Sequence, residues 1–200
     1  MNSETIFRII FILSFAAFAV VRMYYRVTTA KASSKKDKPR ESQLQLGLQL
    51  ITGLIGMGLV FIYIFAPQWL VWAELPLPGW LRWLGAILGL FSVPLLLWIH
   101  RTLGKQFSST LQLESDHVLV TDGPYHWMRH PMYTALYMQL SGWLLLSANG
   151  LLGLYWLGIF TLIVATRIHD EETMLLKAFG DEYRVYMQKT GRFLPSLFSS

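Results

Sequence analysis

Five apolar stretches, each close to the length of a membrane-crossing helix, constrain this chain more than any other feature. About 20 consecutive apolar residues are needed to cross a bilayer as a helix. The stretches cover approximately 6–25, 46–66, 80–100, 131–147 and 151–167. The 200-residue chain is 54% hydrophobic and only 14% charged, which is too apolar for a water-soluble core of this size. We therefore predict an all-α integral membrane protein with about five transmembrane helices.

A cleaved signal peptide is the alternative interpretation of the first stretch. Residues 16–19 (Ala-Ala-Phe-Ala) are similar to a cleavage site. The apolar run continues past these alanines, and Glu4 accompanies Arg8 ahead of it. A retained transmembrane helix is the preferred interpretation.

The distribution of lysine and arginine predicts the orientation of these helices. Seven basic residues lie in 22–41, none lies in 67–79, and further basic residues lie in 101–129 and 177–192. With five crossings, every basic cluster falls on one face. Cytoplasmic loops are enriched in basic residues, so we expect the N-terminus outside and the C-terminus in the cytoplasm. The basic first loop can also contact anionic membrane lipids.

Two polar stretches on that face complete the expected organisation. Residues 103–129 are too polar to cross a membrane, and their alternation predicts a small hairpin or extended loop within 107–121. Residues 168–195 predict two amphipathic helices, the first ended by Gly180 and the second capped by Asp181. We expect 1–102 to form three helices with the basic loop. We expect 103–200 to form a catalytic half containing the cytoplasmic loop, the transmembrane hairpin 131–167 and the C-terminal helices.

Polar residues converge at the open end of this predicted hairpin. Arg129-His130-Pro131 begins the fourth helix, and Arg167 ends the fifth. The turn 147–150 makes these two helices antiparallel, so both groups lie at the same membrane surface. Glu171 and Glu172 follow within about one further turn. Each residue taken singly has a structural explanation, such as snorkelling or an ordinary ion pair, but their convergence indicates a functional site.

Several classes of site are not expected. The chain contains no cysteine, which excludes a disulfide, a thiolate nucleophile and a cysteine-ligated metal; no metal site is predicted. No aromatic side chains accompany the basic charges after Tyr25, so nucleic acid is not an expected partner. No glycine-rich phosphate-binding loop is present.

The same residues carry a resemblance to a known family. Gly123-Pro124-Tyr125, Arg129-His130-Pro131-Met132-Tyr133, and the series from Arg167 through Glu171-Glu172 to Tyr186 resemble the isoprenylcysteine carboxyl methyltransferase family. Related membrane phospholipid methyltransferases share the pattern. The resemblance covers about 103–195. It implies a monomeric helical enzyme that uses S-adenosyl-L-methionine, with a cytoplasmic cofactor pocket closed by the C-terminal segment and a lipid-like substrate arriving from the bilayer.

The resemblance also implies roles for individual residues. The positions expected to line the cofactor are His117, Val118, Leu119, Val120, Gly123, Tyr125, His130, Pro131 and Tyr133. The expected catalytic residues are Arg167, Glu171 and Glu172. Arg167 would orient an acceptor carboxylate and one of the two glutamates would hold polar groups of the cofactor. Which glutamate has which role is left open.

Four functions are therefore compared. Carboxyl O-methylation of an isoprenylcysteine-like substrate is preferred, because a carboxylate needs no general base and an arginine can hold it in line. N-methylation of a phospholipid or other lipophilic amine is the near alternative, and it would need a carboxylate as base. An NADPH-dependent reductase of the sterol type and a non-catalytic membrane scaffold are the remaining hypotheses.

Overall fold

The computed structural model describes residues 2–32, 43–104 and 118–196. The long helices are α1 (Ser3–Ala32), α2 (Gln43–Phe65), α3 (Gly79–Leu103), α4 (Pro131–Ser147) and α5 (Gly150–Phe179). The shorter elements are η1 (Pro67–Ala73), η3 (Gly123–His126) and α6 (Asp181–Lys189). No β-strand forms in these ranges, which confirms the all-α prediction for the described part of the chain. The hairpin predicted within 107–121 lies almost wholly outside the described residues.

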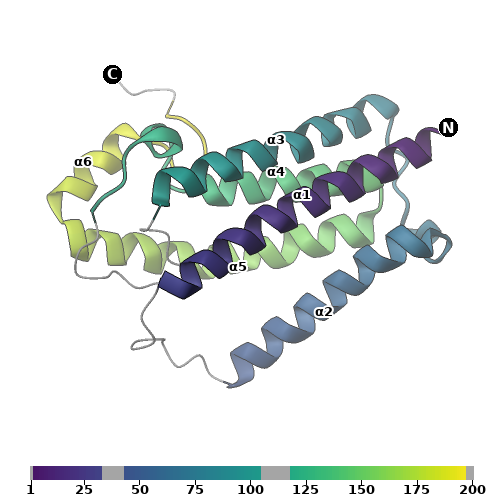
Figure 1. Ribbon diagram of the computed structural model, residues 1–200, viewed down its shortest axis with the longest axis horizontal. Helices are drawn as coiled ribbons and strands as arrows, with labels where there is room; N and C mark the ends of the chain where they lie inside the picture. The colour runs from purple at the N-terminus through teal and green to yellow at the C-terminus, as the bar shows by residue number, and fades with distance from the viewer. Residues whose placement is uncertain (1, 33–42, 105–117, 197–200) are drawn as a thin grey trace.

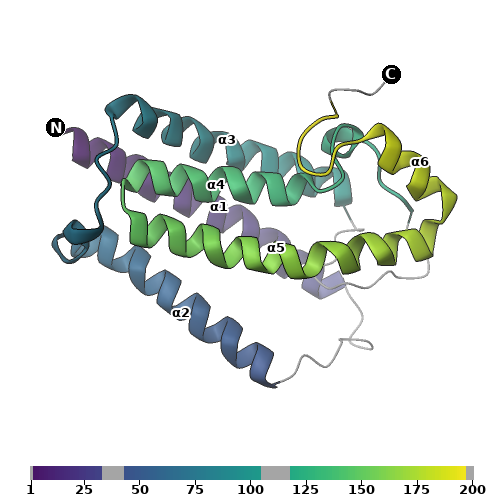
Figure 2. The same cartoon turned by 180° about the vertical axis from the view of Figure 1, so that it is seen from behind.

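The five long helices run alternately between two ends of the molecule (Figures 1 and 2). α1 and α3 finish, and α4 begins, at the end that carries Arg22, Arg26, Arg101 and Arg129. We call this the basic end. The opposite end holds the N-terminus, η1 and the α4–α5 turn. Successive helices thus run in opposite directions, as is expected of helices that cross a membrane one after another.

Four of these helices are long and apolar enough to cross a membrane, over Ser3–Thr28, Gly47–Phe65, Gly79–Leu103 and Gly150–Phe179. Their outward surfaces expose large apolar side chains, such as Leu54 at 72% and Phe65 at 75% exposure. Lipid can solvate such surfaces, whereas water cannot without a large cost. The prediction of a multi-pass helical membrane protein is confirmed at this level. α4 has 17 residues, so a fifth crossing stays a prediction.

The most extensive contact between helices joins α3 to α4 and depends on glycine. A Cβ atom at Gly142 would lie 2.8 Å from the backbone nitrogen of Gly89, and one at Gly85 would lie 2.9 Å from the backbone nitrogen of Leu146. Small residues let two helix backbones approach this closely. Within α2, a Cβ at Gly56 would lie 2.5 Å from the Trp156 ring of α5, whereas Gly53 and Gly58 face open space. α2 packs mainly on α5 and η1, at the edge of the bundle (Figure 1).

The predicted turn between α4 and α5 is formed as expected. Ala148 adopts a left-handed conformation with φ of 47°. The Asn149 side chain caps α5 by accepting from the Leu152 backbone N–H at 3.1 Å, and its Nδ2 donates to the Leu70 carbonyl oxygen at 2.8 Å. Such a cap satisfies one of the donors that a helix start leaves free. The turn therefore makes α4 and α5 an antiparallel hairpin and anchors it to η1.

The predicted end of the fifth helix is wrong. α5 does not stop near Arg167 but continues unbroken to Phe179, so the first of the two expected tail helices is the extension of α5. The change from apolar to charged residues marks where the helix leaves the apolar layer, and nothing between Arg167 and Phe179 breaks a helix. Gly180, with φ of 54°, ends α5 as predicted. Gly180 is also the N-cap of α6, whereas Asp181 was expected in that role.

Candidate active site

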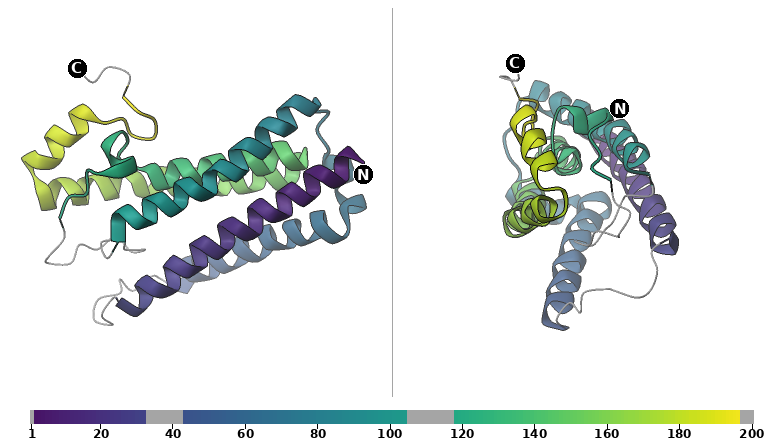
Figure 3. Two further views of the ribbon diagram at one scale, coloured as in Figure 1. Left: turned by 45° about the horizontal axis from the view of Figure 1, so that its top comes forward. Right: turned by 90° about the vertical axis from the view of Figure 1, so that its left-hand side faces the viewer.

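The predicted site lies at the basic end, where the start of α4, the last part of α5, α6 and residues 190–196 come together (Figures 2 and 3). α6 folds back after Gly180, and the Tyr186 hydroxyl donates to the Tyr125 carbonyl oxygen at 2.6 Å. This bond attaches α6 to η3. The hairpin thus brings His130 of the α4 cap and Glu172 of α5 within 3.3 Å of each other.

Glu172 is buried and fully engaged by cationic and imidazole partners. Arg192 donates to it twice, Nε at 3.1 Å and one terminal nitrogen at 2.5 Å. Arg129 Nε lies 3.4 Å away, and His130 Nε2 lies 3.3 Å from the same oxygen. Paired guanidinium and carboxylate groups make strong charge-assisted bonds. Glu172 therefore joins α4, α5 and the C-terminal segment, and its charge is neutralised inside the protein.

The C-terminal segment is also fastened through its backbone. The Arg129 N–H donates to the Gly191 carbonyl at 2.9 Å, and the His130 N–H donates to the Arg192 carbonyl at 3.0 Å. The Arg129 guanidinium donates to the carbonyl oxygens of Met187, at 3.0 Å, and Thr190. Gly191 is required in this turn, because an added Cβ would lie 1.8 Å from the Leu194 carbonyl oxygen. Arg129 thus faces the C-terminal segment and connects it to Glu172.

Glu171, the neighbouring carboxylate, is in a different environment. Its side chain is 30% exposed, its Oε2 accepts from the Tyr133 hydroxyl at 2.8 Å, and His130 Nδ1 lies 3.8 Å away. Burial lowers the pKa of His130 below its usual range, against the opposing effect of the two glutamates. A neutral imidazole carries a single N–H and can donate to one carboxylate at a time. Glu171 is consequently the less neutralised of the pair.

Arg167 lies one helical turn before Glu171 and is exposed. The ordinary i,i+4 ion pair with Glu171 is not formed, and no described carboxylate pairs with Arg167. Its charge acts on the Tyr133 hydroxyl, as does that of Arg22 from α1. The structure therefore places Arg167, which has no ion-pair partner among the described residues, one helical turn from a partly exposed carboxylate at the boundary of the apolar bundle.

Of the residues predicted to line a cofactor, His117 lies outside the described residues. The others fall into two groups. His130, Pro131 and Tyr133 are at the start of α4, next to Glu171. Tyr125 approaches the same carboxylate from η3, where the charge of Glu171 acts on it, and burial raises the pKa of Tyr125 above its usual range.

The second group forms the approach to η3. Val118 is 64% exposed, whereas Leu119 and Val120 are half-buried. Gly123 has φ of 56°, and a Cβ there would lie 2.6 Å from the Thr102 hydroxyl oxygen. A glycine is needed here for both reasons. Gly123 therefore lets η3 begin directly against the end of α3.

Tyr183 and Arg192 belong to this site and were not predicted as site residues. Tyr183 is 1% exposed, and its hydroxyl has no hydrogen-bond partner in the part of the chain that the structure describes. The charges of Glu172, Arg129 and Glu171 act on it, and burial raises its pKa. Its position on one face of α6 was visible in the helical spacing. The contact between Arg192 and Glu172 had no signal in the sequence, because it depends on how the segment after α6 folds back.

His126 and His130 are four positions apart in the sequence, a spacing at which two metal ligands can share one face of a helix. His126 lies in η3 and His130 caps α4, so they do not share a helix face. Within the described ranges, no group of three or more histidine or acidic residues is placed to hold a metal ion.

The fold and the site together define a class: multi-pass helical membrane proteins with an arginine–carboxylate site at one end of the bundle. Residues 85–177 match the family model described as the isoprenylcysteine carboxyl methyltransferase family. Through this region the chain is similar to that family, which agrees with the resemblance noted in the sequence.

Curated relatives carry the name protein-S-isoprenylcysteine O-methyltransferase, and three of them are compared with this chain. The protein of Tribolium castaneum is 39% identical over 97 residues, which are 47% of this chain and 34% of the relative. That of Homo sapiens is 29% identical over 133 residues, 66% of this chain and 47% of the relative. That of Saccharomyces cerevisiae is 36% identical over 96 residues, 47% of this chain and 40% of the relative. The chain thus spans less than half the length of these relatives.

A solved structure is similar over a larger part. It is that of the eukaryotic intramembrane Ras methyltransferase, isoprenylcysteine carboxyl methyltransferase, without a monobody. The TM-score is 0.59 and the sequence identity 25%, and the similarity covers 95% of this chain and 68% of the other. The helical arrangement is therefore shared well beyond the segment matched by the family model.

Proposed function

We propose that this protein is a methyltransferase that uses S-adenosyl-L-methionine to methylate the carboxylate of a lipophilic, isoprenylcysteine-like acceptor. The observation that carries the proposal is the contrast at the basic end. Glu172 is neutralised by Arg192 and Arg129, while Arg167 has no ion-pair partner in the described chain and faces the same site. An arginine in this state can bind an anionic acceptor, and the apolar helices beside it can bind the acceptor's hydrophobic part.

The site offers groups suited to the cofactor. The unpartnered Tyr183 hydroxyl and the partly exposed Glu171 are a donor and an acceptor that a ligand rich in hydroxyl and amino groups can satisfy. We assign Glu171, with His130 and Tyr133, to the cofactor's polar groups. The surrounding wall would comprise His117, Val118, Leu119, Val120, Gly123, Tyr125 and Pro131.

The chain's own residues would then align the reaction. When bound, S-adenosyl-L-methionine supplies an electrophilic methyl group on a positively charged sulfur. Arg167 would hold the acceptor carboxylate so that one oxygen points at that methyl group. A carboxylate is already an anion, so no side chain need remove a proton. Alignment of the reactants is then the main contribution of the protein. Glu172 would act through its partners, by keeping the C-terminal segment closed over the site.

We further propose that the basic end is cytoplasmic, with the N-terminus outside and α4 as the fifth crossing. The basic residues at this end, including those of 22–41, support this orientation. The cofactor is made in the cytosol, so the site must open there. A monomer suffices, because the proposed site is built from one chain together with a lipophilic acceptor and the surrounding lipids.

N-methylation of a phospholipid or another lipophilic amine is the second candidate. The state of Glu171 favours it, since a carboxylate held by a phenol and an imidazole could accept a proton from an ammonium group. Arg167, which has no ion-pair partner in the described chain, opposes it, because it would repel a cationic acceptor. The two candidate functions therefore differ in the charge of the group that binds beside Arg167: an anionic carboxylate for O-methylation, or a cationic ammonium group for N-methylation.

The test uses the purified protein in detergent. Calorimetry should detect binding of S-adenosylhomocysteine, and NADPH should not bind. Radiolabelled methyl transfer is then measured to N-acetyl-S-farnesylcysteine and to phosphatidylethanolamine, where base-labile label indicates an ester and stable label an amine. Binding of NADPH alone would support a reductase, and binding of neither ligand a scaffold; either result overturns the proposal.

Arg167→Ala provides the first mutational prediction. Turnover should fall at least 100-fold, as is common when a group that aligns the reactants is removed, while S-adenosylhomocysteine affinity stays within about twofold. Arg101→Ala is the matched control, since Arg101 is an exposed arginine at the same end. Unchanged turnover in Arg167→Ala would remove Arg167 from the site.

A further inference from the structure

An apolar hollow runs along α1 and ends in arginine. It has a volume of about 200 Å³ and is lined by Phe15, Phe18, Ala19, Arg22, Met23 and Arg26 of α1 and by Trp143 of α4. The α1 residues recur at helical spacing and so form one face. Phe15 and Trp143 lie toward the middle of the bundle, whereas Arg22 and Arg26 lie at the basic end. The hollow is thus apolar along its length and cationic at one end.

Arg22 has no acidic partner in the part of the chain that the structure describes. Among the described residues it makes a hydrogen-bond contact with the Met132 sulfur at 3.2 Å. The groups that interact with it electrostatically include two further arginines, Arg26 and Arg167, the Tyr133 hydroxyl and His100. Like charges gathered near an apolar surface are costly unless an anion joins them. No carboxylate of the described residues supplies such an anion, so this end of the hollow is suited to an anionic group.

The cationic end of the hollow continues directly into the site. Met132, which contacts Arg22, is followed by Tyr133, whose hydroxyl donates to Glu171 at 2.8 Å. Arg22 and Arg167 both act on that hydroxyl, one from α1 and one from α5. An anionic group bound between the two arginines would therefore lie beside Tyr133 and Glu171, where the proposed reaction takes place.

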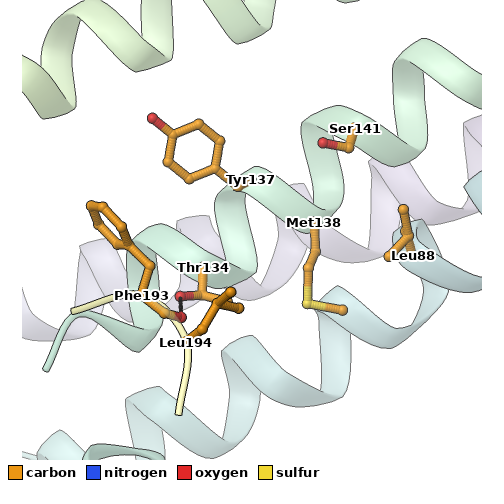
Figure 4. A pocket seen from close by; sticks show the side chains of 7 residues that line it. All are labelled: Leu88, Thr134, Tyr137, Met138, Ser141, Phe193 and Leu194. Carbon is orange, nitrogen blue, oxygen red and sulfur yellow. Dashed lines mark hydrogen bonds between the residues drawn. The ribbon is translucent and has the colours of Figure 1, made fainter. Parts of the chain in front are cut away.

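A second apolar hollow differs from the first in having no charged side chain in its lining. Seven residues line it, Leu88, Thr134, Tyr137, Met138, Ser141, Phe193 and Leu194, and it measures about 240 Å³ (Figure 4). None of these side chains is charged. This hollow lies between α3, α4 and the C-terminal segment, and it can hold an apolar chain but its lining offers no cationic side chain for an anionic head. Charge complementarity therefore selects the hollow along α1 for an acceptor with a negatively charged head and an apolar tail.

We propose that Arg22 is a second arginine for the acceptor carboxylate and that the α1 hollow holds the acceptor's apolar chain. This inference rests on the proposed carboxyl methylation. It makes α1, which lies outside residues 85–177, a determinant of specificity. Arg167 and Arg22 approach the carboxylate from opposite helices, so acceptors that bear an anionic head on an apolar chain are preferred over neutral ones. Arg22 acts mainly on binding, because it lies at the mouth of the hollow.

Kinetics of Arg22→Ala test the first half of the proposal. With N-acetyl-S-farnesylcysteine, KM should rise roughly tenfold or more, the effect of losing one charge-assisted bond. The kcat should change by less than about threefold, and S-adenosylhomocysteine affinity should be unchanged. Arg22→Lys should recover part of the loss, and Arg101→Ala should behave like the wild type. An unaltered KM in Arg22→Ala, or a parallel loss of S-adenosylhomocysteine binding, overturns the inference.

A neutral analogue separates charge recognition from a structural effect. The carboxamide of N-acetyl-S-farnesylcysteine carries no charge, so its inhibition constant should be the same in the wild type and in Arg22→Ala. If the variant weakens the carboxamide as much as the carboxylate, Arg22 shapes the hollow without binding the head, and the inference fails.

Filling the two hollows tests the second half. Ala19→Trp should shift the preference from farnesyl to shorter geranyl acceptors, whereas Ser141→Trp in the uncharged hollow should not. The reverse result would assign the tail to the hollow between α3 and α4 and overturn the proposal. If the wild type shows no methyl transfer or does not bind S-adenosylhomocysteine, the proposed function itself is wrong. If the wild type is active but Arg22→Ala leaves KM unchanged, only this inference is wrong.

Discussion

Glu171 and Glu172 are adjacent in sequence, yet a helix turns about 100° per residue, so their side chains leave α5 in different directions. Glu172 is directed into the interior and meets Arg192, Arg129 and His130. Glu171 meets the Tyr133 hydroxyl and remains partly exposed. At the scale of single residues, the structure thus separates two carboxylates that the sequence left equivalent.

That separation predicts opposite phenotypes for two matched variants. Glu172→Gln should lower the free energy of unfolding by about 2 kcal/mol, because it leaves buried Arg129 without its counter-charge; the half-exposed Arg192 limits the loss. Glu171→Gln should change stability by less than about 0.5 kcal/mol but abolish methyl transfer. Thermal unfolding in detergent and the radiolabel assay measure the two effects. Equal destabilisation by both variants would contradict the assignment.

Tyr183→Phe tests the unpartnered hydroxyl. Removing a buried hydroxyl that has no hydrogen-bond partner should leave the stability of the ligand-free protein unchanged or slightly raised. Affinity for S-adenosylhomocysteine should fall roughly tenfold, since we assign this hydroxyl to the cofactor. Tyr186→Phe is the informative comparison, because Tyr186 donates to the Tyr125 carbonyl and its loss should instead lower stability. Unchanged affinity in Tyr183→Phe would remove that hydroxyl from the cofactor site.

At the scale of helices, the contact of α3 with α4 sets the position of the site. The backbones approach through Gly85, Gly89 and Gly142, and η3 is seated on the end of α3 by Gly123. Residues expected in separate halves, 1–102 and 103–200, therefore share one core, which contains Phe11, Ala86 and Trp143 among others. The division at residue 102 stays a prediction about function.

Gly142→Ala measures the importance of that contact. The added methyl would lie 2.8 Å from the Gly89 nitrogen, so the helices must move apart, at a cost of about 1–3 kcal/mol. The variant should show a lower thermal midpoint and weaker S-adenosylhomocysteine binding, because α4 carries His130 and Tyr133. Gly58→Ala is the control, since an added methyl there meets nothing within 4 Å. An unchanged thermal midpoint and unchanged S-adenosylhomocysteine binding in Gly142→Ala would show that α3 and α4 can move apart without cost.

At the scale of the whole molecule, the question is which end faces the cytoplasm. The chain has no cysteine, so single cysteines can be introduced without background. A membrane-impermeant maleimide added to intact cells should label Glu74→Cys, at the end opposite the site. It should label Lys189→Cys only after permeabilisation. The reverse labelling would place the basic end outside, and labelling of both from one side would contradict an odd number of crossings.

Much of the arrangement was predictable because it follows from local chemistry. Apolar runs of membrane length predicted the helices, Gly180 predicted the end of α5, and the turn at 147–150 predicted that Arg129 and Arg167 lie at one end. The boundary of the fifth helix was not predictable in this way. Hydropathy reports where the chain leaves lipid, but a helix continues through polar residues as long as its backbone bonds are made.

By itself, the sequence determined a helical membrane protein, its basic end and the residues that meet there, because these depend on composition, spacing and turns. Only the tertiary structure decided what each polar residue does. Residues 190–196 fold back and place Arg192 on Glu172, whereas Glu171 stays partly exposed. α1 packs beside α4 and brings Arg22 next to Tyr133. Both depend on contacts between segments far apart in the chain, and no local pattern encodes such contacts.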